Sequence, residues 1–336
     1  MPVGGGLVRP RILFVYQLPS PFILQDRDLL RRFGEVQDFR WTDHRHPARA
    51  LPRWMVRNRR AFDLVFVWFG DVHASVATRA ARLLGKPSVL VAGGYDVSDL
   101  PGYGFLSTPA GLRRARGHFG RASRILAVSA AVWNTLAAKF PDVAAKAEVL
   151  PLAVDADRFR PDGPRRACVL SVAGAGMWER AWVKGWDRVA EVARAMPDVP
   201  FLLIGGSADV ARRLDPPPNL TIKEEVPQDA LVREYQTASV YLQPSRSEAF
   251  GMSVLEAMAC GEVPVVTAVG GMPDLVGDAG FVVEEKVEAL ASAVRRALTA
   301  KDLSAKARAR AATEFSLARR EDGLRRVLES ALASPP

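Results

Sequence analysis

Two carboxylates, Glu248 and Glu256, have seven residues between them at a point where an apolar strand pattern gives way to a helical one. Gly251 lies between them, at the junction of loop and helix. Free backbone N–H groups at a helix start attract anions, and a glycine lets a phosphate group come close. A phosphate-binding turn flanked by two carboxylates that accept hydrogen bonds from hydroxyls suits a nucleotide-sugar.

Each carboxylate also has a structural interpretation. Glu248 could be a helix-entry residue that the helix dipole stabilises, and Glu256 could belong to a salt bridge in the core. Glu256 lies inside an apolar helical turn, where an unpaired charge would be costly. A hydroxyl-bearing ligand would relieve that cost, so we favour the ligand-binding interpretation for both residues.

Two cations stand in a second loop of the same kind. Arg180 and Lys184 lie in residues 174–185, a loop that follows a predicted strand and precedes a predicted helix. Cations at such a position would neutralise the charge that builds on a departing diphosphate. The alternative is that both are exposed residues that only aid solubility.

Strands and helices alternate along the whole chain. Near-continuous apolar strands between amphipathic helices predict parallel sheets that helices cover on both faces, which is a doubly wound α/β architecture. The clearest expected strands are residues 12–16, 64–69, 87–92, 124–128, 168–172, 201–204, 240–243 and 263–267. The clearest expected helices are residues 22–33, 73–84, 186–196, 229–238 and 317–332, and several smaller helices precede the last one.

A proline-rich stretch divides the chain. Residues 152–163 read as an interdomain linker, because Pro151, Pro161 and Pro164 bracket this stretch. We therefore expect two Rossmann-like domains, residues 1–155 and 156–315, facing each other across a cleft, and a final helix over residues 316–336. Ligands bind at the carboxyl ends of the strands in such sheets, so the two loops above should converge there.

The composition is that of a soluble enzyme. The 336 residues are 49% hydrophobic and 25% charged, and no run of about eighteen apolar residues could span a membrane. The first ten residues lack an apolar signal core, so we expect a cytoplasmic protein. Cys168 and Cys260 lie in apolar segments without the spacing of a zinc site or a disulfide scaffold.

Residues 244–266 resemble, almost residue for residue, the donor-binding signature of the retaining GT-B glycosyltransferases usually numbered family four, the group 1 glycosyl transferases. Residues 270–276 continue that resemblance. Residues 151–161 resemble the family's linker signature, with Ala153 where a glycine is usual. The resemblance implies the GT-B fold, with a final helix that crosses back onto the first domain.

The resemblance also implies roles for individual residues. Glu248 would contact the transferred sugar and Glu256 the ribose hydroxyls, while Lys184 and Arg180 would hold the donor diphosphate. The spacing between these two cations is tighter than in many relatives, which makes Lys184 the firmer assignment. Backbone groups around the phosphate and the nucleobase would come from Ala249, Phe250, Gly251, Met252 and Val226.

The first half matches the family less well. Relatives often carry a histidine just after the strand equivalent to residues 88–92, where this chain has Gly93-Gly94-Tyr95-Asp96. Asp96 is our candidate for that catalytic position. His73 and His118 are alternatives, although each lies in a helical pattern where a capping or surface role is the simpler interpretation.

Together these residues predict a retaining glycosyltransferase that moves a sugar from a nucleoside-diphosphate sugar to a hydroxyl acceptor, which could be a sugar, a lipid-linked sugar or a small molecule. We expect neither a cofactor nor a metal. Asp155-Ala156-Asp157 spells a metal-binding motif of another transferase fold, but it stands in the linker signature, where a structural role is expected. A nucleotide-sugar epimerase, or a non-catalytic protein that binds sugar nucleotides or polyanions, remains as an alternative.

Basic residues are concentrated in the first half, where residues 1–160 carry 24 Lys and Arg against 13 Asp and Glu. An arginine-rich composition explains part of this excess, and an anionic partner would explain its position. Residues 49–60 mix five arginines with apolar side chains at helical spacing, which suggests peripheral contact with an anionic membrane. The alternative is a surface helix packed on the sheet. No recognition motif supports a nucleic-acid partner.

Overall fold

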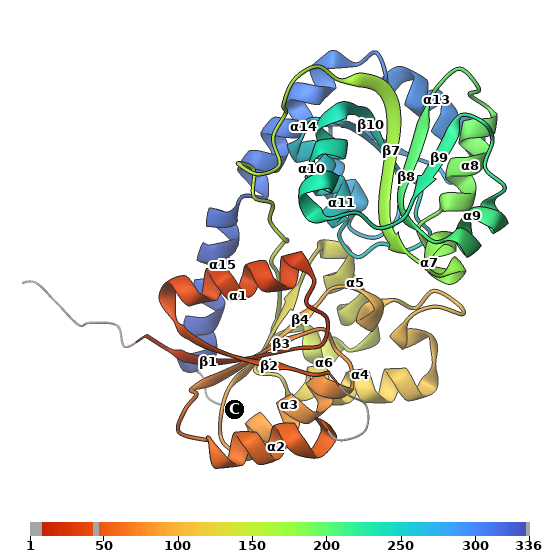
Figure 1. The fold of residues 1–336 in the computed structure, drawn as a ribbon. Coiled ribbons are helices and arrows are strands. Elements are labelled where there is room, and N and C mark those ends of the chain that lie inside the picture. Colours follow the sequence, from red (N-terminus) through yellow and green to blue (C-terminus); the bar gives the residue numbers. More distant parts are fainter. Residues whose placement is uncertain (1–8, 43–46, 334–336) are drawn as a thin grey trace, which may run out of the picture. The chain divides into compact units, whose positions relative to one another are not determined.

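The computed structural model describes residues 9–42 and 47–333, and the chain divides into two compact units. One unit comprises Met1–Pro151 with Ala318–Pro336, and the other comprises Leu152–Leu317. Each unit contains one six-stranded sheet whose neighbouring strands all run parallel, with helices on both faces (Figure 1). The predicted architecture of two Rossmann-like domains is confirmed.

The sheet of the first unit has the strand order β2-β1-β3-β4-β5-β6. Its central strands β3 and β4 are buried at every position, which matches their continuous apolar sequences. The edge strand β2 alternates between exposed and half-buried residues. The strands are β1 (Arg11–Tyr16), β2 (Glu35–Arg40), β3 (Leu64–Trp68), β4 (Ser88–Ala92), β5 (Arg124–Ala127) and β6 (Ala147–Val149).

The helices of this unit begin where the sequence supplies caps and prolines. Ser129 Oγ accepts from Val132 N at 3.2 Å at the start of α5, and Pro21 is the first residue of α1. The helices are α1 (Pro21–Phe33), α2 (Pro47–Arg57), α3 (Val72–Leu83), α4 (Pro109–Arg121), α5 (Ala130–Lys139), α6 (Pro141–Ala144) and α15 (Leu317–Ala333), with 3₁₀ turns η1 (Tyr95–Val97) and η2 (Phe105–Ser107).

A buried ion pair attaches the last helix to the first unit. Arg320 on α15 donates from Nε and Nη2 to the two carboxylate oxygens of Asp26 on α1, at 2.9 and 2.6 Å. Both side chains are 1% exposed. Arg320 Nη1 also donates to the carbonyls of Leu150 and Pro151, where the chain leaves this unit. One guanidinium therefore joins α1, α15 and the segment Leu150–Pro151.

The sheet of the second unit has the strand order β12-β11-β10-β7-β8-β9. Its strands are β7 (Arg166–Ala175), β8 (Phe201–Gly206), β9 (Leu220–Lys223), β10 (Ala238–Gln243), β11 (Val263–Thr267) and β12 (Phe281–Val283). Its helices are α7 (Trp178–Val183), α8 (Trp186–Arg194), α9 (Ala208–Leu214), α10 (Gln228–Thr237), α11 (Met252–Ala259), α12 (Met272–Val276), α13 (Val287–Ala297) and α14 (Lys301–Glu314). Helices α8, α9 and α13 form one core with the sheet, and α14 packs on α11.

The stretch expected to be a linker is part of the second unit. Within residues 152–163, Val154 pairs with Ser316 in an isolated bridge, and Phe159 is buried. Arg308 on α14 donates to the carbonyls of Ala156 and Phe159 at 2.8 Å. Asp155 Oδ1 accepts from the N–H groups of Asp157 and Arg158, which closes a local turn. These contacts give Asp155 the structural role that its position predicts.

The Asp26–Arg320 pair makes a prediction about stability. D26A leaves the Arg320 charge buried without its partner, which should lower the free energy of unfolding by about 3–5 kcal/mol. The matched control is E321A, which removes the partner of Arg32 in an ion pair between the same two helices. Arg32 is 59% exposed, so this loss should stay within about 1 kcal/mol. Urea denaturation of both variants measures the difference, and equal losses would contradict the assignment.

Candidate functional site

Three neighbouring strands of the second unit end at one edge of the sheet. Strands β11, β10 and β7 are adjacent and parallel, so the loops that follow them leave from the same edge. The loop after β7 leads through α7 to Lys184, and the loop after β10 carries Glu248. The loop after β11 carries Gly270 and Gly271. The predicted donor-binding segments therefore meet, as their positions after strands indicate.

Lys184 and Glu248 form an ion pair in this loop cluster. Lys184 Nζ lies 2.6 Å from Glu248 Oε2, and the two side chains are 27% and 11% exposed. Partial burial strengthens the attraction between opposite charges relative to bulk water. An anion that binds Lys184 must therefore compete with Glu248.

Glycines hold the main chain of Glu248 in place. Gly271 N donates to Glu248 O at 3.2 Å. Gly270 has a φ of +55°, and a Cβ there would lie 1.5 Å from Glu248 O. Any side chain at this position would collide with the carbonyl, so the close approach requires glycine.

The start of α11 has the backbone geometry predicted for an anion site. Gly251 has a φ of +106° and precedes Met252, the first residue of the helix. The N–H groups of a first helical turn have no partner within the helix. Phe250 is buried and packs edge-on against Phe315, with ring centroids 5.8 Å apart. This contact anchors the turn before α11. Ala249 completes the connection to Glu248.

Glu256 has a partner that the sequence did not indicate. Tyr235 on α10 donates from its hydroxyl to Glu256 Oε2 at 3.0 Å. Burial raises the pKa of Glu256 to about 7, and the Tyr235 hydrogen bond opposes part of that shift. Tyr235 is itself enclosed between the rings of Phe159 and Tyr241. A tyrosine within an amphipathic helix carries no signal that would separate this role from simple core packing.

Arg180 and Val226 take no part in the Lys184–Glu248 ion pair. Arg180 is exposed on α7 and makes no ion pair with any residue that the structure describes. Its carbonyl accepts from Lys184 N at 3.0 Å, so the two residues share one short turn. Val226 is half-buried in the loop after β9.

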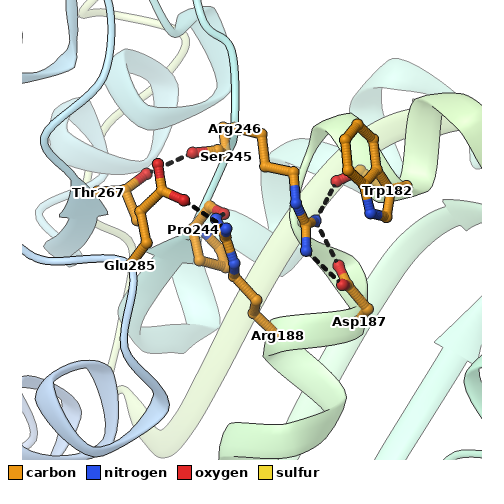
Figure 2. Close-up of polar contacts among 8 residues, drawn as sticks. All are labelled: Trp182, Asp187, Arg188, Pro244, Ser245, Arg246, Thr267 and Glu285. Atoms are coloured by element: carbon orange, nitrogen blue, oxygen red, sulfur yellow. Dashed lines mark hydrogen bonds and ion pairs between the residues drawn. The ribbon is translucent and has the colours of Figure 1, made fainter. Parts of the chain in front are cut away.

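Arginines fasten the loops around the ion pair, and sequence reasoning did not assign them a role. Figure 2 shows Arg188, whose Nη1 donates to Pro244 O at 3.0 Å and whose Nη2 pairs with Glu285. In the same view, Arg246 extends from the loop after β10 to Trp182 on α7 and Asp187 on α8. Arg246 lies within residues 244–266, which resemble the donor-binding signature, and Arg188 follows the segment 174–185 that carries Lys184. Their partners become apparent only once the loops are brought together.

Asp96 lies in the first unit, where its carboxylate joins two loops. Its Oδ2 accepts from Gly70 N at 2.9 Å, and its Oδ1 accepts from Gly94 N at 2.8 Å and from Gly93 N at 3.3 Å. Burial raises the pKa of Asp96 to about 6 although these donors favour the charged form. Both oxygens are thus engaged in holding the loops that follow β3 and β4.

The two histidines considered as alternatives are both buried. His73 Nε2 lies 2.7 Å from Trp68 O, and burial lowers its pKa. Burial also lowers the pKa of His118 to about 3, and its Nδ1 lies 3.2 Å from Ser75 Oγ. Both rings are therefore neutral near pH 7 and occupied in packing.

The arginine-rich stretch forms α2, which packs against α3. Leu51 and Met55, two of its own side chains, are fully buried. Arg49, Arg53 and Arg57 are exposed on its other side and line a shallow groove with Pro52 and Val56. The helix thus buries one apolar stripe and presents a basic face. Across the described part of the chain, no helix combines the length and apolar character needed to cross a membrane.

Comparisons with known proteins relate this chain to glycosyl transferases. Residues 179–314 match the family model described as glycosyl transferases group 1. The chain is 34% identical over 155 residues to D-inositol 3-phosphate glycosyltransferase of Segniliparus rotundus, a match that covers 40% of this chain and 34% of that protein. The chain thus spans about a third of the length of this relative.

A second relative matches over more of its length. The GDP-mannose-dependent alpha-(1-6)-phosphatidylinositol monomannoside mannosyltransferase of Mycolicibacterium smegmatis is 30% identical over 288 residues, which cover 74% of this chain and 73% of that protein. Among solved structures, Anabaena HepE in complex with UDP and glucose superposes with a TM-score of 0.74 at 18% identity. That likeness covers 96% of this chain and 100% of HepE, and it shows a shared fold.

The raised pKa of Glu256 predicts a pH dependence of stability. An unfolded glutamate titrates near pH 4.3, so between about pH 4.3 and 7 the folded protein binds a proton that the unfolded chain has released. The stability linked to protonated Glu256 is complete below this window and lost as the pH rises through it, by on the order of 3 kcal/mol.

Urea denaturation of E256Q should therefore show a smaller fall in unfolding free energy from pH 4 to 8 than the parent protein shows. Y235F removes a donor that favours the charged carboxylate and should extend the fall to higher pH. Identical pH profiles for the parent and E256Q would contradict the assignment.

Proposed function

The chain belongs to the glycosyl transferases group 1 family, and on that premise we propose that it is a retaining glycosyltransferase. It would move a sugar from a nucleoside-diphosphate sugar to a hydroxyl acceptor. The observation that carries this proposal is the Lys184–Glu248 pair at 2.6 Å, next to the helix start at Gly251. A cation for phosphate, a carboxylate for sugar hydroxyls and a helix terminus for an anion occur together there.

Lys184 and the first turn of α11 would bind the diphosphate, and Arg180 would join them by turning its exposed side chain inward. As the bond between the sugar and the diphosphate breaks, negative charge builds on the diphosphate, and these positive groups stabilise it. We propose that they perform the task for which other transferases use a metal ion, so that the reaction needs neither a metal nor a cofactor.

Donor binding would exchange the partners of Glu248. Lys184 moves from the carboxylate to the diphosphate, and Glu248 then accepts hydrogen bonds from hydroxyls of the transferred sugar. After transfer the sugar has left, so Glu248 regains Lys184 and competes with the remaining nucleoside diphosphate. This exchange would favour the complete donor over the spent product.

Glu256 would accept hydrogen bonds from the ribose hydroxyls, and Val226 would lie near the nucleobase. The carboxylate form of Glu256 is the better acceptor, and its pKa of about 7 places the change of form close to neutrality. Tyr235 would hold the carboxylate in place for the ribose. Backbone groups of Ala249, Phe250 and Met252 would complete the donor site around Gly251.

The acceptor would carry a hydroxyl group on a sugar, a lipid-linked sugar or a small molecule. The names of the two relatives, an inositol phosphate glycosyltransferase and a phosphatidylinositol mannoside mannosyltransferase, support acceptors of these classes. Asp96 would shape the acceptor loop at Gly93 and Gly94. It would act through the backbone, because both of its oxygens already accept from N–H groups.

We further propose that α2 makes peripheral contact with an anionic membrane at the cytoplasmic face. Its exposed Arg49, Arg53 and Arg57 supply the charge, and Val56, which is 51% exposed, supplies an apolar contact. A lipid-linked acceptor would then be within reach of the membrane-bound protein. Nucleic acid is not part of this proposal.

A panel of nucleoside diphosphates tests the donor site by thermal shift. A ligand present at a hundred times its Kd should stabilise the protein by about 2.7 kcal/mol. K184A and E256A should each abolish the shift, because they remove a phosphate contact and a ribose contact. Unchanged shifts in both variants would overturn the site assignment.

The variant E248Q tests the exchange within the same panel. It frees Lys184 from its partner, so nucleoside diphosphate should bind at least as tightly as to the parent, while sugar transfer falls. E284Q is the matched control, because it removes the same charge from another Lys–Glu pair of the same unit, Lys286–Glu284, whose side chains are 73% and 72% exposed. If the protein converts the donor sugar to its epimer without an acceptor, it is an epimerase. If it binds the nucleotide-sugar and transfers no sugar, it is a non-catalytic binding protein.

Vesicle flotation tests the membrane contact. The triple variant R49Q/R53Q/R57Q should lose about a hundredfold in affinity for phosphatidylglycerol vesicles, because each arginine near such a surface contributes about 1 kcal/mol. R166Q/R212Q/R295Q removes the same charge from exposed positions of the second unit and should keep most of the binding. Equal losses would show that net charge alone attracts the protein.

A further inference from the structure

One side chain joins the turn that bears Lys184 to the loop that bears Glu248. Arg246 donates from Nη1 to Asp187 Oδ1 at 2.8 Å and from Nη2 to Asp187 Oδ2 at 2.6 Å, which makes a two-pronged contact (Figure 2). Its Nη1 also donates to Trp182 O at 2.5 Å. Trp182 and Asp187 stand on either side of Lys184 in the chain, so Arg246 spans the whole turn.

The guanidinium is held by its face as well as by its edge. Its central carbon lies 4.4 Å from the centroid of the Trp182 ring, within the range of a cation–π contact. The Arg246 and Asp187 side chains are 16% and 27% exposed, so solvent screens their attraction only in part. Ring, carbonyl and carboxylate together leave the guanidinium one orientation.

The main chains of the two segments are in contact at the same place. Arg246 N donates to Val183 O at 2.8 Å. Gly185 has a φ of +74°, and a Cβ there would lie 1.9 Å from Pro244 O. The segments before and after Lys184 are therefore both fastened to the loop that leads to Glu248, two residues beyond Arg246.

We propose that Arg246 is a positioning residue that sets the separation of Lys184 and Glu248, and through it the affinity for the donor diphosphate. This inference rests on the proposed function. Arg246 would not itself touch the diphosphate, because both of its terminal nitrogens already donate to Asp187 or Trp182. It would hold the Lys184 turn so that Nζ points to the position the phosphate takes.

The geometry suits arginine and not lysine. A planar fork can meet both oxygens of one carboxylate while it stacks on a ring, whereas an ammonium group is a point charge on a flexible stem. R246K should therefore recover only part of the function lost in R246A. D187N, which leaves Arg246 in place but weakens its main contact, should resemble R246K.

Calorimetric titration of nucleoside diphosphate into the full-length protein provides the test. R246A should weaken binding about tenfold or more at a temperature where urea denaturation shows it to be folded. In the R246A background, the further loss caused by K184A should be several-fold smaller than in the parent, because Lys184 is already misplaced. If R246A itself fails to fold, R246K and D187N carry the same comparison.

The matched control is R308A. Arg308 lies in the same unit and donates to three backbone carbonyls, those of Ala156, Phe159 and Ala259. It should cost stability without changing nucleotide affinity. An R246A protein that is less stable but binds nucleoside diphosphate as tightly as the parent would overturn the inference.

Two other outcomes are also informative. If R246A weakens binding while the K184A penalty stays undiminished, Arg246 contacts the diphosphate directly and the positioning role is wrong. If the parent protein binds no nucleoside diphosphate, the proposed function fails and this inference fails with it.

Discussion

The ion pair between Lys184 and Glu248 forms only if the loops that follow two different strands come within hydrogen-bonding distance of each other. Neither charge is fully exposed, so each would be costly without a partner in the free protein. The pair satisfies both groups while keeping them beside the start of α11. A ligand with a phosphate and a hydroxyl-bearing ring can replace both halves of the contact at once, and a bare anion can replace only one.

Glycines and arginines build the frame around that pair. Gly185 and Gly270 let one main chain approach another more closely than any side chain would permit. Arg188 and Arg246 then fasten the loops by donating to carbonyls and carboxylates. Hydrophobic contacts hold the sheet beneath, but polar contacts with defined geometry hold the loops, which suits a site that must present charges at fixed distances.

Polar side chains also fasten segments together away from the Lys184–Glu248 pair. Asp96 joins the loops after β3 and β4 through backbone N–H groups, and Arg320 joins α15 to α1 through a buried carboxylate. In the second unit, Arg308 fastens the proline-rich stretch to α14. A segment that the sequence presents as a linker thus has a defined conformation, because two of its carbonyls accept hydrogen bonds from Arg308.

Local patterns in the sequence are enough to predict the buried strands, several amphipathic helices such as α8 and α15, and loops that bring Lys184 and Glu248 to one edge of a sheet. Continuous apolar runs and helix starts are local signals. The edge strands β2, β6 and β9 mix polar with apolar residues, because an edge is covered on fewer sides, and the apolar edge strand β12 has only three residues. Helix α14 buries only small residues such as Ala307 and Ala311. The partners of Arg246, Glu256 and Asp96 become apparent only in the folded chain. The contacts of Arg246 with Asp187, of Tyr235 with Glu256 and of Gly70 with Asp96 join segments far apart in the chain, and a side chain's type does not say which distant group it will contact.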